Sequence, residues 1–296
     1  MVNVRRLKTK AIPWLFLLPC LVIVFSIGIY PFYVMWDISL HHFDTSTPKT
    51  MGQRAYFENY RTMLHNPDFW DSLGRTFQIM IPSVIVEMLL GLAIAQLVSS
   101  KVPDKYRKIL VPLLIIPMTL APICVGLVWR YILHGDFGVV TYFLNSMGLF
   151  LEESMLGSRS WAWVAVTIVD IWEWTPFTFL IFLSGLLALP KDTYEAAEIE
   201  GATAWMKFRY LTLRYLKPLI GIALILRFMD GIKLFDTIYI LTGGGPAAST
   251  ETLIYYTYRV SYIWWNLGYG AALSLFLFFI IIIACEFFYN ITARRE

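Results

Sequence analysis

The chain has 296 residues, of which 58% are hydrophobic and 15% are charged, with a formal net charge of +3. Ordinary soluble domains carry about 45–50% apolar and about 25% charged residues. One core cannot hide such an excess, because a folded chain of this size still exposes a large surface. Much of the surface must therefore face lipid. This composition excludes a soluble enzyme, a disordered chain and a secreted disulfide scaffold.

Six apolar segments are long enough to cross a bilayer, whose hydrocarbon core of about 30 Å needs about 20 helical residues. The predicted spans are, in chain order, Ala11 to Trp36, Thr76 to Ser100, Ile109 to Trp129, Ser160 to Pro190, Pro218 to Leu241 and Val260 to Cys285. Transmembrane strands are excluded because they alternate over about 10 residues. We predict an all-α integral membrane protein with six transmembrane helices.

Lysine and arginine distribution predicts how the spans are threaded. Fifteen of these residues fall in the terminal segments and the loops on their side, and five fall in the opposite loops. Cytoplasmic loops carry the excess of basic residues, so both termini are predicted to be cytoplasmic. Residues 1–71 then form a cytoplasmic segment, the first helix and an outer loop, and residues 72–296 form a five-helix core.

Sequence motifs for catalysis are absent. The glycine-rich stretch Gly243 to Pro246 lacks the lysine with which a nucleotide-binding P-loop reaches phosphates. The chain shows no serine-hydrolase or zinc-protease motif, and its three cysteines lie in apolar stretches, so no metal site is predicted. We expect a transporter that is not itself an enzyme and carries no cofactor.

The segment from Lys191 to Pro218 is the most informative loop. Its start, around Glu195, is strongly helical, and Gly201 then marks a bend or a close backbone approach, because glycine weakens a helix. An ordinary surface loop is the simpler interpretation. Its length of about 28 residues with organised helices favours a docking role.

Three motifs together carry a family resemblance. The loop reads E-A-A-x-x-x-G from Glu195 to Gly201; the run L-T-G-G-G-P begins at Leu241; and W-x-W-T-P-F begins at Trp172. Over about residues 70–290 the chain resembles the permeases of binding-protein-dependent ABC importers, and among them the maltose-type subunit with a type I importer fold. The family's loop usually reads L-P near its end, where this chain has Leu213-Arg214.

The resemblance implies partners and a coupling site. It implies a bacterial inner-membrane subunit that forms a heterodimer with a second permease, two ATPase domains that hold ATP and Mg, and an extracytoplasmic solute-binding protein; no nucleic acid is expected. In this family the EAA loop is a pair of coupling helices seated in a cleft of the ATPase. The implied ATPase-coupling residues are Glu195, Ala196, Ala197, Glu200, Gly201 and Phe208.

Charged residues within two spans point to a solute site, since charges inside a bilayer are costly and often functional. Sugar sites combine aromatic faces with carboxylates or amides. The resemblance places the fourth span on the sugar site and aligns part of the fifth span with it, on a single helix face. The candidate substrate-binding residues are Asp170, Trp172, Glu173, Trp174, Phe177, Arg227, Asp230, Gly231 and Leu234.

Structural pairing is the competing interpretation for each of these charges. Arg227 and Asp230 are three residues apart and could satisfy one another. Arg227 could also suit an anionic sugar derivative.

We expect ATP-driven import of a sugar or sugar-like solute (an oligosaccharide, polyol or sugar derivative) by alternating access. An importer of another solute class, a secondary transporter and a membrane enzyme are the alternatives. A secondary transporter would tolerate substitution of Glu195 or Gly201, whereas an importer subunit would lose uptake. An enzyme would form product without partners.

Overall fold

The computed structural model describes residues 16–45, 51–148 and 154–293, and these are helical apart from short loops and two isolated β-bridges. The predicted basic residues of the extreme termini and Lys49 lie outside the described residues. The chain divides into two compact units: unit 1 is Met1–Asn66 with Thr257–Phe276, and unit 2 is Pro67–Tyr256 with Leu277–Glu296.

Unit 1 contains an N-terminal helix and the loop that follows it. The helix Phe16–Ser39 includes a π-helical turn, η1 (Phe25–Ile29), and α2 (Tyr30–Ser39), and α3 (Glu58–His65) follows the loop. The buried Asn59 amide of α3 donates to the carbonyl oxygens of Ser39 at 2.8 Å and His41 at 3.1 Å. These bonds hold α3 against the end of α2 and the start of the loop. The remaining elements of unit 1 are η3 (Arg259–Ile263) and the first part of α15 (Leu267–Ala293).

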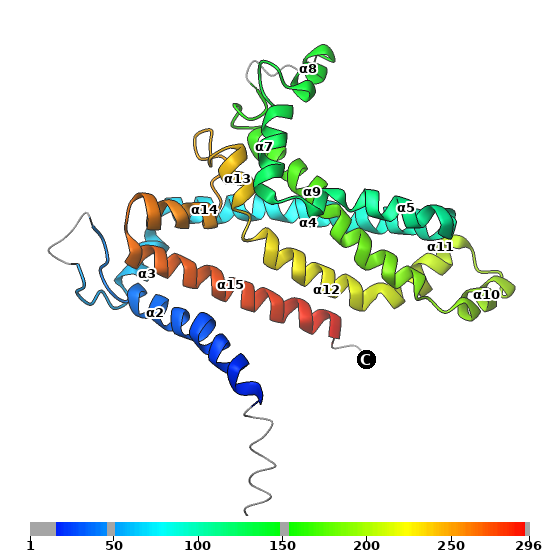
Figure 1. Cartoon of the computed structure of the whole chain (residues 1–296), viewed down its shortest axis with the longest axis horizontal. Helices are drawn as coiled ribbons and strands as arrows, with labels where there is room; N and C mark the ends of the chain where they lie inside the picture. Colours follow the sequence, from blue (N-terminus) through cyan, green and yellow to red (C-terminus); the bar gives the residue numbers. More distant parts are fainter. Residues whose placement is uncertain (1–15, 46–50, 149–153, 294–296) are drawn as a thin grey trace, which may run out of the picture. The chain divides into compact units, whose positions relative to one another are not determined.

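Unit 2 is built on two long helices that lie side by side, α4 (Pro67–Lys101) and α9 (Ala162–Leu187) (Figure 1). The buried residues of α4 recur at intervals of three and four, as one face of a helix requires. A Cβ at Gly91 on this face would collide with the side chain of Thr178, whose hydroxyl donates to the Glu87 carbonyl oxygen at 2.7 Å. Glycine therefore allows α4 and α9 to approach closely.

The third predicted span is not one continuous helix. It consists of α5 (Asp104–Leu114), α6 (Ile116–Thr119) and α7 (Pro122–Ile132). Pro117 and Pro122 lack an amide hydrogen, and a proline disfavours helical dihedral angles at the residue before it. Ala121 accordingly has an extended backbone. The prolines explain why the apolar run breaks twice.

The fifth predicted span is also interrupted. Helix α12 (Leu213–Gly231) is followed by a turn and then by α13 (Asp236–Leu241). On its other side, α12 continues without a break from α11 (Ala204–Met206) and a π-helical segment, η2 (Lys207–Thr212). Arg214, which replaces the proline usual in the family, is compatible with this uninterrupted helix.

Four described helices are long and apolar enough to cross a membrane: Phe16–Ser39, Pro67–Lys101, Ala162–Leu187 and Leu267–Ile291. The last begins at Leu267, later than the predicted Val260, because α14 (Leu253–Tyr258) and η3 end at a turn. The four match the first, second, fourth and sixth predicted spans. The number of crossings and the side of the termini stay predictions.

Two apolar clusters pack unit 2. One lies beside α7 and α13 and includes Val125, Val169 and Ile238. The other holds the C-terminal halves of α4 and α9 against α12, with Phe179, Phe182 and Leu216 at its centre. The second cluster fixes the start of the loop that follows α9.

Candidate functional site

The loop after α9 is a compact helical hairpin whose first element is α10 (Lys191–Ile199). Gly201 has φ +78°, the amide of Ala202 donates to the Ala197 carbonyl oxygen at 2.9 Å, and the amide of Gly201 donates to Glu198 at 3.0 Å. This pair of bonds is the Schellman motif, which needs a left-handed residue. A Cβ at Gly201 would meet no atom within 4 Å. Gly201 therefore serves the bend and does not allow a close approach within the chain.

Polar contacts hold the second half of the hairpin against the first. The Thr203 hydroxyl accepts from the amide of Met206 and caps α11. Lys207 forms an ion pair with Glu198, and the Tyr194 and Thr212 hydroxyls lie 2.9 Å apart. The loop is thus preorganised by its own residues.

The proposed coupling residues lie at the surface of this hairpin. Glu195, Ala196, Glu200 and Gly201 are exposed, while Ala197 and Phe208 are half-buried. Neither the Glu195 nor the Glu200 side chain has a hydrogen bond or ion pair within the described part of the chain. Two carboxylates at this surface are therefore available to a partner.

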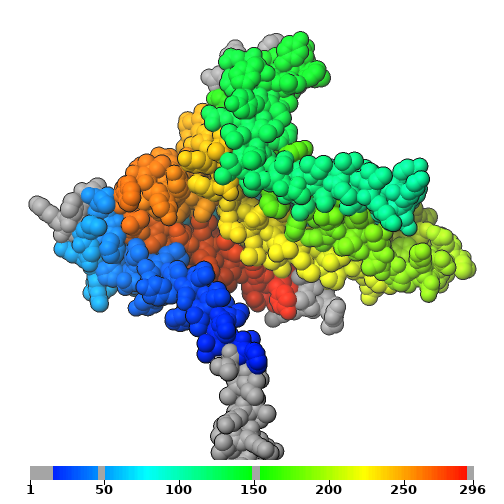
Figure 2. Space-filling view, viewed as in Figure 1, coloured from blue at the N-terminus to red at the C-terminus, as the bar shows by residue number. Residues whose placement is uncertain are grey.

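Large apolar side chains are exposed on the same hairpin. Ile199 is 89% exposed and Trp205 is 65% exposed, and Met206 and Tyr210 are exposed with them. Figure 2 shows the surface of this segment, in yellow-green, at one end of unit 2. Several large apolar side chains exposed on one polar segment are typical of protein-binding sites.

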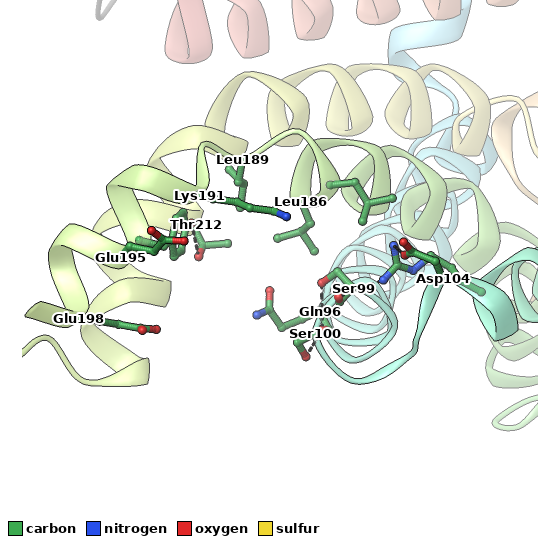
Figure 3. Close-up of a pocket in the computed structure, with 13 residues that line it drawn as sticks. Gln96, Ser99, Ser100, Asp104, Leu186, Leu189, Lys191, Glu195, Glu198 and Thr212 are labelled. Carbon is green, nitrogen blue, oxygen red and sulfur yellow. Dashed lines mark hydrogen bonds and ion pairs between the residues drawn. The ribbon is translucent and has the colours of Figure 1, made fainter.

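A polar groove of about 820 Å³ runs between α10 and the C-terminal end of α4. In Figure 3, Glu195 and Glu198 lie on one side, and Gln96, Ser99 and Ser100 lie on the other. The Arg107 guanidinium donates to the carbonyl oxygen of Ser99 in the last turn of α4, at 3.2 Å, and to that of Val102 just beyond the helix, at 2.9 Å. The groove brings one proposed coupling residue, Glu195, beside the end of the second span.

The second group of candidate residues surrounds a buried arginine in the helix bundle. Arg227 of α12, 1% exposed, forms a two-point ion pair with Glu87 of α4, at 2.5 Å for Nε–Oε2 and 2.8 Å for Nη2–Oε1. Its Nη2 also donates to Asp170 of α9 at 3.1 Å, and its Nη1 to Asp230 at 3.2 Å. We call Arg227, Glu87, Asp170 and Asp230 the arginine cluster. It ties three helices together.

Aromatic side chains of α9 flank the cluster. The Arg227 Cζ atom lies 4.9 Å from the Trp174 ring centroid, a cation–π distance. Trp174 in turn packs edge-on to Phe177. Trp172 lies apart from this group and is exposed, with Trp129 against its ring at 5.6 Å. The structure thus brings Trp174 and Phe177 beside the charges but not Trp172.

Three buried polar groups near the cluster lack hydrogen-bond partners within the described residues: Ser83 Oγ, Asp170 Oδ1 and Glu173 Oε2. Ser83 precedes Glu87 by one helical turn and Glu173 follows Asp170 by three residues, so each shares a face with a member of the cluster. Glu173 lies close enough to Asp170, Arg227 and Asp230 for their charges to act on it. Orphaned buried acceptors are unusual in native structures.

The expectation that Leu234 shares a helix face with Arg227, Asp230 and Gly231 is wrong. Helix α12 ends at Gly231, and amide bonds to residues three earlier then form a turn through Leu234. Leu234 packs instead beside α7 and α13, against the first apolar cluster. Gly231 itself is buried, and Met80 fills the space that a Cβ would need.

Glu87 is the functional candidate that the site prediction omits. Because it is the one charged residue of an apolar span, Glu87 is expected to face the interior of the bundle. The sequence does not indicate its partner, Arg227, which lies 140 residues away. Among the described residues, no group of three His, Cys, Asp or Glu side chains is arranged to hold a metal ion.

Relatives of known class share this architecture. The chain is 34% identical over 274 residues to the trehalose/maltose transport system permease protein MalF of Thermococcus litoralis, covering 91% of this chain and 89% of that protein. It is 36% identical to the sulfoquinovosyl glycerol transport system permease protein SmoG of Agrobacterium fabrum, over 75% of this chain and 71% of that one.

A chain of the bacterial ABC transporter involved in the import of the acidic polysaccharide alginate has the same fold. It superposes with a TM-score of 0.84 and full coverage of both chains, at 18% identity. Fold and relatives together define a membrane permease subunit, a transport component and not an enzyme. The family model for the inner membrane component of binding-protein-dependent transport systems matches residues 87–296, and the chain belongs to that family. It is accordingly a multi-pass protein of the inner membrane.

Proposed function

We propose that this permease imports a sugar or a sugar-like solute. The observation that carries the proposal is the likeness, over most of the chain, to permeases whose names specify trehalose, maltose and sulfoquinovosyl glycerol. Trp174, which stacks on Arg227, and Asp230, which bonds to it, supply the aromatic and acceptor groups that a polyol needs.

The working complex in this proposal is a heterodimer of this chain and a second permease, with two ATPase domains that bind ATP and Mg and an extracytoplasmic solute-binding protein. Membership of a binding-protein-dependent transport family supports the ATPase and the solute-binding protein. The chain is threaded with six crossings and both termini in the cytoplasm, which follows from its basic-residue asymmetry. In this threading the hairpin after α9 faces the cytoplasm.

The coupling step is assigned to that hairpin. Glu195 and Glu200 offer unpaired carboxylates to basic groups of an ATPase, and Ile199 and Trp205 offer apolar anchors. The Schellman bend at Gly201 keeps the hairpin rigid, so that movement of the ATPase is transmitted to α9 and α12 at its two ends. Alternating access then moves these helices about the solute site.

The solute site is assigned to the exposed edge of the arginine cluster. Asp230 has 45% of its side-chain surface exposed, and the half-buried Trp174, which stacks on Arg227, and Phe177, which packs on Trp174, form an aromatic wall. Glu173 and Asp170 support this wall from within α9. Gly231 keeps the backbone close to α4 and does not itself offer a contact.

Uptake by the reconstituted complex tests the proposal. Proteoliposomes with the permease pair, the ATPase and the cognate binding protein are expected to accumulate radiolabelled trehalose or maltose only with ATP. Glu195→Ala should abolish uptake and the ATPase stimulation by loaded binding protein. Its control is Glu58→Ala, an exposed carboxylate of the outer loop that leaves both unchanged. Accumulation without ATP, or with a Glu195→Ala rate equal to the parent, would refute the assignment.

A further inference from the structure

Four of the five N–H donors of Arg227 are already in use. Nε and Nη2 bond to Glu87, Nη2 also bonds to Asp170, and Nη1 bonds to Asp230. A guanidinium has five N–H donors, and a sulfonate, phosphate or carboxylate is usually recognised by two of them in parallel. In this chain the parallel donors Nε and Nη2 bond to the two carboxylate oxygens of Glu87. An anionic solute would therefore have to displace a carboxylate from the arginine.

Acidic groups outnumber basic groups around the site. Glu87, Asp170, Glu173 and Asp230 surround the single guanidinium of Arg227. Two more charged residues follow in the chain, Lys233 and Asp236; both are exposed, and the charge of Asp236 also acts on Glu173. A solute with a negative charge would meet repulsion from the exposed carboxylate of Asp230, because like charges placed together at a binding surface disfavour binding.

The unused polar groups of the site are mostly acceptors. Asp170 Oδ1 and Glu173 Oε2 are buried and meet no donor in good hydrogen-bond geometry within the described residues, although the Ser83 hydroxyl lies close enough to Asp170 to act on it. Both carboxylates are 1% exposed. Acceptors without donors are satisfied by a ligand that brings O–H or N–H groups, and the accessible acceptor that such a ligand meets first is Asp230.

We propose that the solute site accepts neutral or cationic sugars, whose hydroxyl or ammonium groups donate hydrogen bonds, and rejects sugars that carry a phosphate, sulfonate or carboxylate. The inference rests on the proposed function, because it specifies the charge class of the sugar at the same site. It separates this chain from relatives whose names specify a sulfonated sugar or an acidic polysaccharide. Asp230 is the specificity-determining residue.

Matched sugars test the inference without the binding protein, whose own selectivity would intervene. The complete permease–ATPase complex in nanodiscs is titrated calorimetrically with trehalose, 6-amino-6-deoxytrehalose, trehalose 6-phosphate and 6-O-acetyltrehalose. The acetyl ester is a neutral control for size. We expect the phosphate to bind at least about tenfold more weakly than the ester, and the amine to bind at least as tightly as trehalose.

Two variants of Asp230 distinguish the effect of its negative charge from the effect of its hydrogen bond to Nη1 of Arg227. Asp230→Asn removes the charge but keeps an acceptor oxygen for Nη1, whereas Asp230→Ala also frees that donor. Affinity for trehalose 6-phosphate should rise about threefold in Asp230→Asn and about tenfold in Asp230→Ala. Affinity for 6-amino-6-deoxytrehalose should fall in both variants. Asp236→Ala, the control, removes an exposed carboxylate whose charge also reaches Glu173 but which makes no bond to Arg227, and it should change each affinity less than Asp230→Asn does.

Three outcomes would overturn the inference. Tight binding of trehalose 6-phosphate to the unchanged complex would contradict it while leaving sugar import intact. An equal gain in Asp236→Ala would show that general charge, and not Asp230, sets the preference. Absence of binding and of ATPase stimulation by all four sugars would refute both the sugar class and the inference.

Discussion

The hairpin after α9 and the arginine cluster are both rich in charge, but they treat it in opposite ways. In the cluster, Arg227 is 1% exposed and bonds to three carboxylates of its own chain. In the hairpin, Glu195 and Glu200 are exposed and make no bond within the described chain. Paired buried charge holds one subunit together, whereas unpaired exposed charge beside apolar side chains is directed at a partner. Substitutions in the arginine cluster should therefore lower the stability of the subunit, whereas substitutions in the hairpin should lower transport and its coupling to ATP hydrolysis.

The largest effect is expected from Arg227→Leu. This change leaves Glu87 and Asp170 buried without their partner, and breaking a buried ion pair from one side costs about 3–5 kcal/mol. The purified subunit should show a strongly lowered thermal midpoint or fail to accumulate. Combining Arg227→Leu with Glu87→Leu and Asp170→Leu should restore part of the midpoint, because the uncompensated charges are then gone. No difference between the single and the triple variant would contradict the pairing.

Gly91→Ala should lower stability next most. Its Cβ would collide with Thr178, which must shift and weaken its bond to the Glu87 carbonyl oxygen, at a cost of about 1–3 kcal/mol. Gly74→Ala is the matched control on the same helix, since a Cβ there meets no atom within 4 Å. It should keep or slightly raise the thermal midpoint. Equal loss in both variants would place the contact between α4 and α9 in doubt.

Gly201→Ala should cost about 1–2 kcal/mol, because a side chain disfavours the left-handed φ of +78°. Gly52, in the loop between α2 and α3, has φ +80° and equally open space, so Gly52→Ala is a control with the same strain. Both should lower stability alike, but only Gly201→Ala should uncouple ATP hydrolysis from uptake. Uncoupling by Gly52→Ala as well would mean that strain alone, and not the hairpin, is responsible.

The smallest change is expected from Lys207→Ala. It removes the ion pair with Glu198, whose side chain is 62% exposed, and exposed pairs contribute at most about 1 kcal/mol. The thermal midpoint should stay nearly unchanged, with a reduced rate of uptake if the hairpin loses its preferred geometry. A midpoint shift as large as that of Gly91→Ala would show that the hairpin is part of the stabilising core.

Much of the fold could be predicted from the sequence, because hydropathy over about 20 residues is a local signal. Four of the predicted spans correspond to long apolar helices. The interruptions were less accessible. Pro117 and Pro122 indicate the breaks in the third span. The turn after Gly231 depends on tertiary packing, which the local sequence does not predict. The spacing alone therefore predicts Leu234 on the face of α12, although this residue lies in the turn beyond the end of the helix.

The site was predictable only where its contacts are local. The pair of Arg227 with Asp230 follows from their spacing on one helix, and the structure has them 3.2 Å apart. Glu87 was recognisable as a lone charge in an apolar span, yet its pairing with Arg227 joins two helices far apart in sequence. The charge balance around Arg227, on which the solute inference depends, therefore required the tertiary structure.

Cysteine crosslinking from the hairpin tests the central claim, that this exposed surface binds the ATPase, most directly. Ile199→Cys is made in a chain whose Cys20, Cys124 and Cys285 are replaced by serine, and the assembled complex is treated with a short bifunctional reagent. We expect a crosslink to the ATPase from position 199 and none from Asn145→Cys in helix α8 (Val139–Ser146), which the proposed threading places on the opposite side of the membrane. An intact complex that gives no crosslink from position 199, or an equal one from position 145, would contradict it.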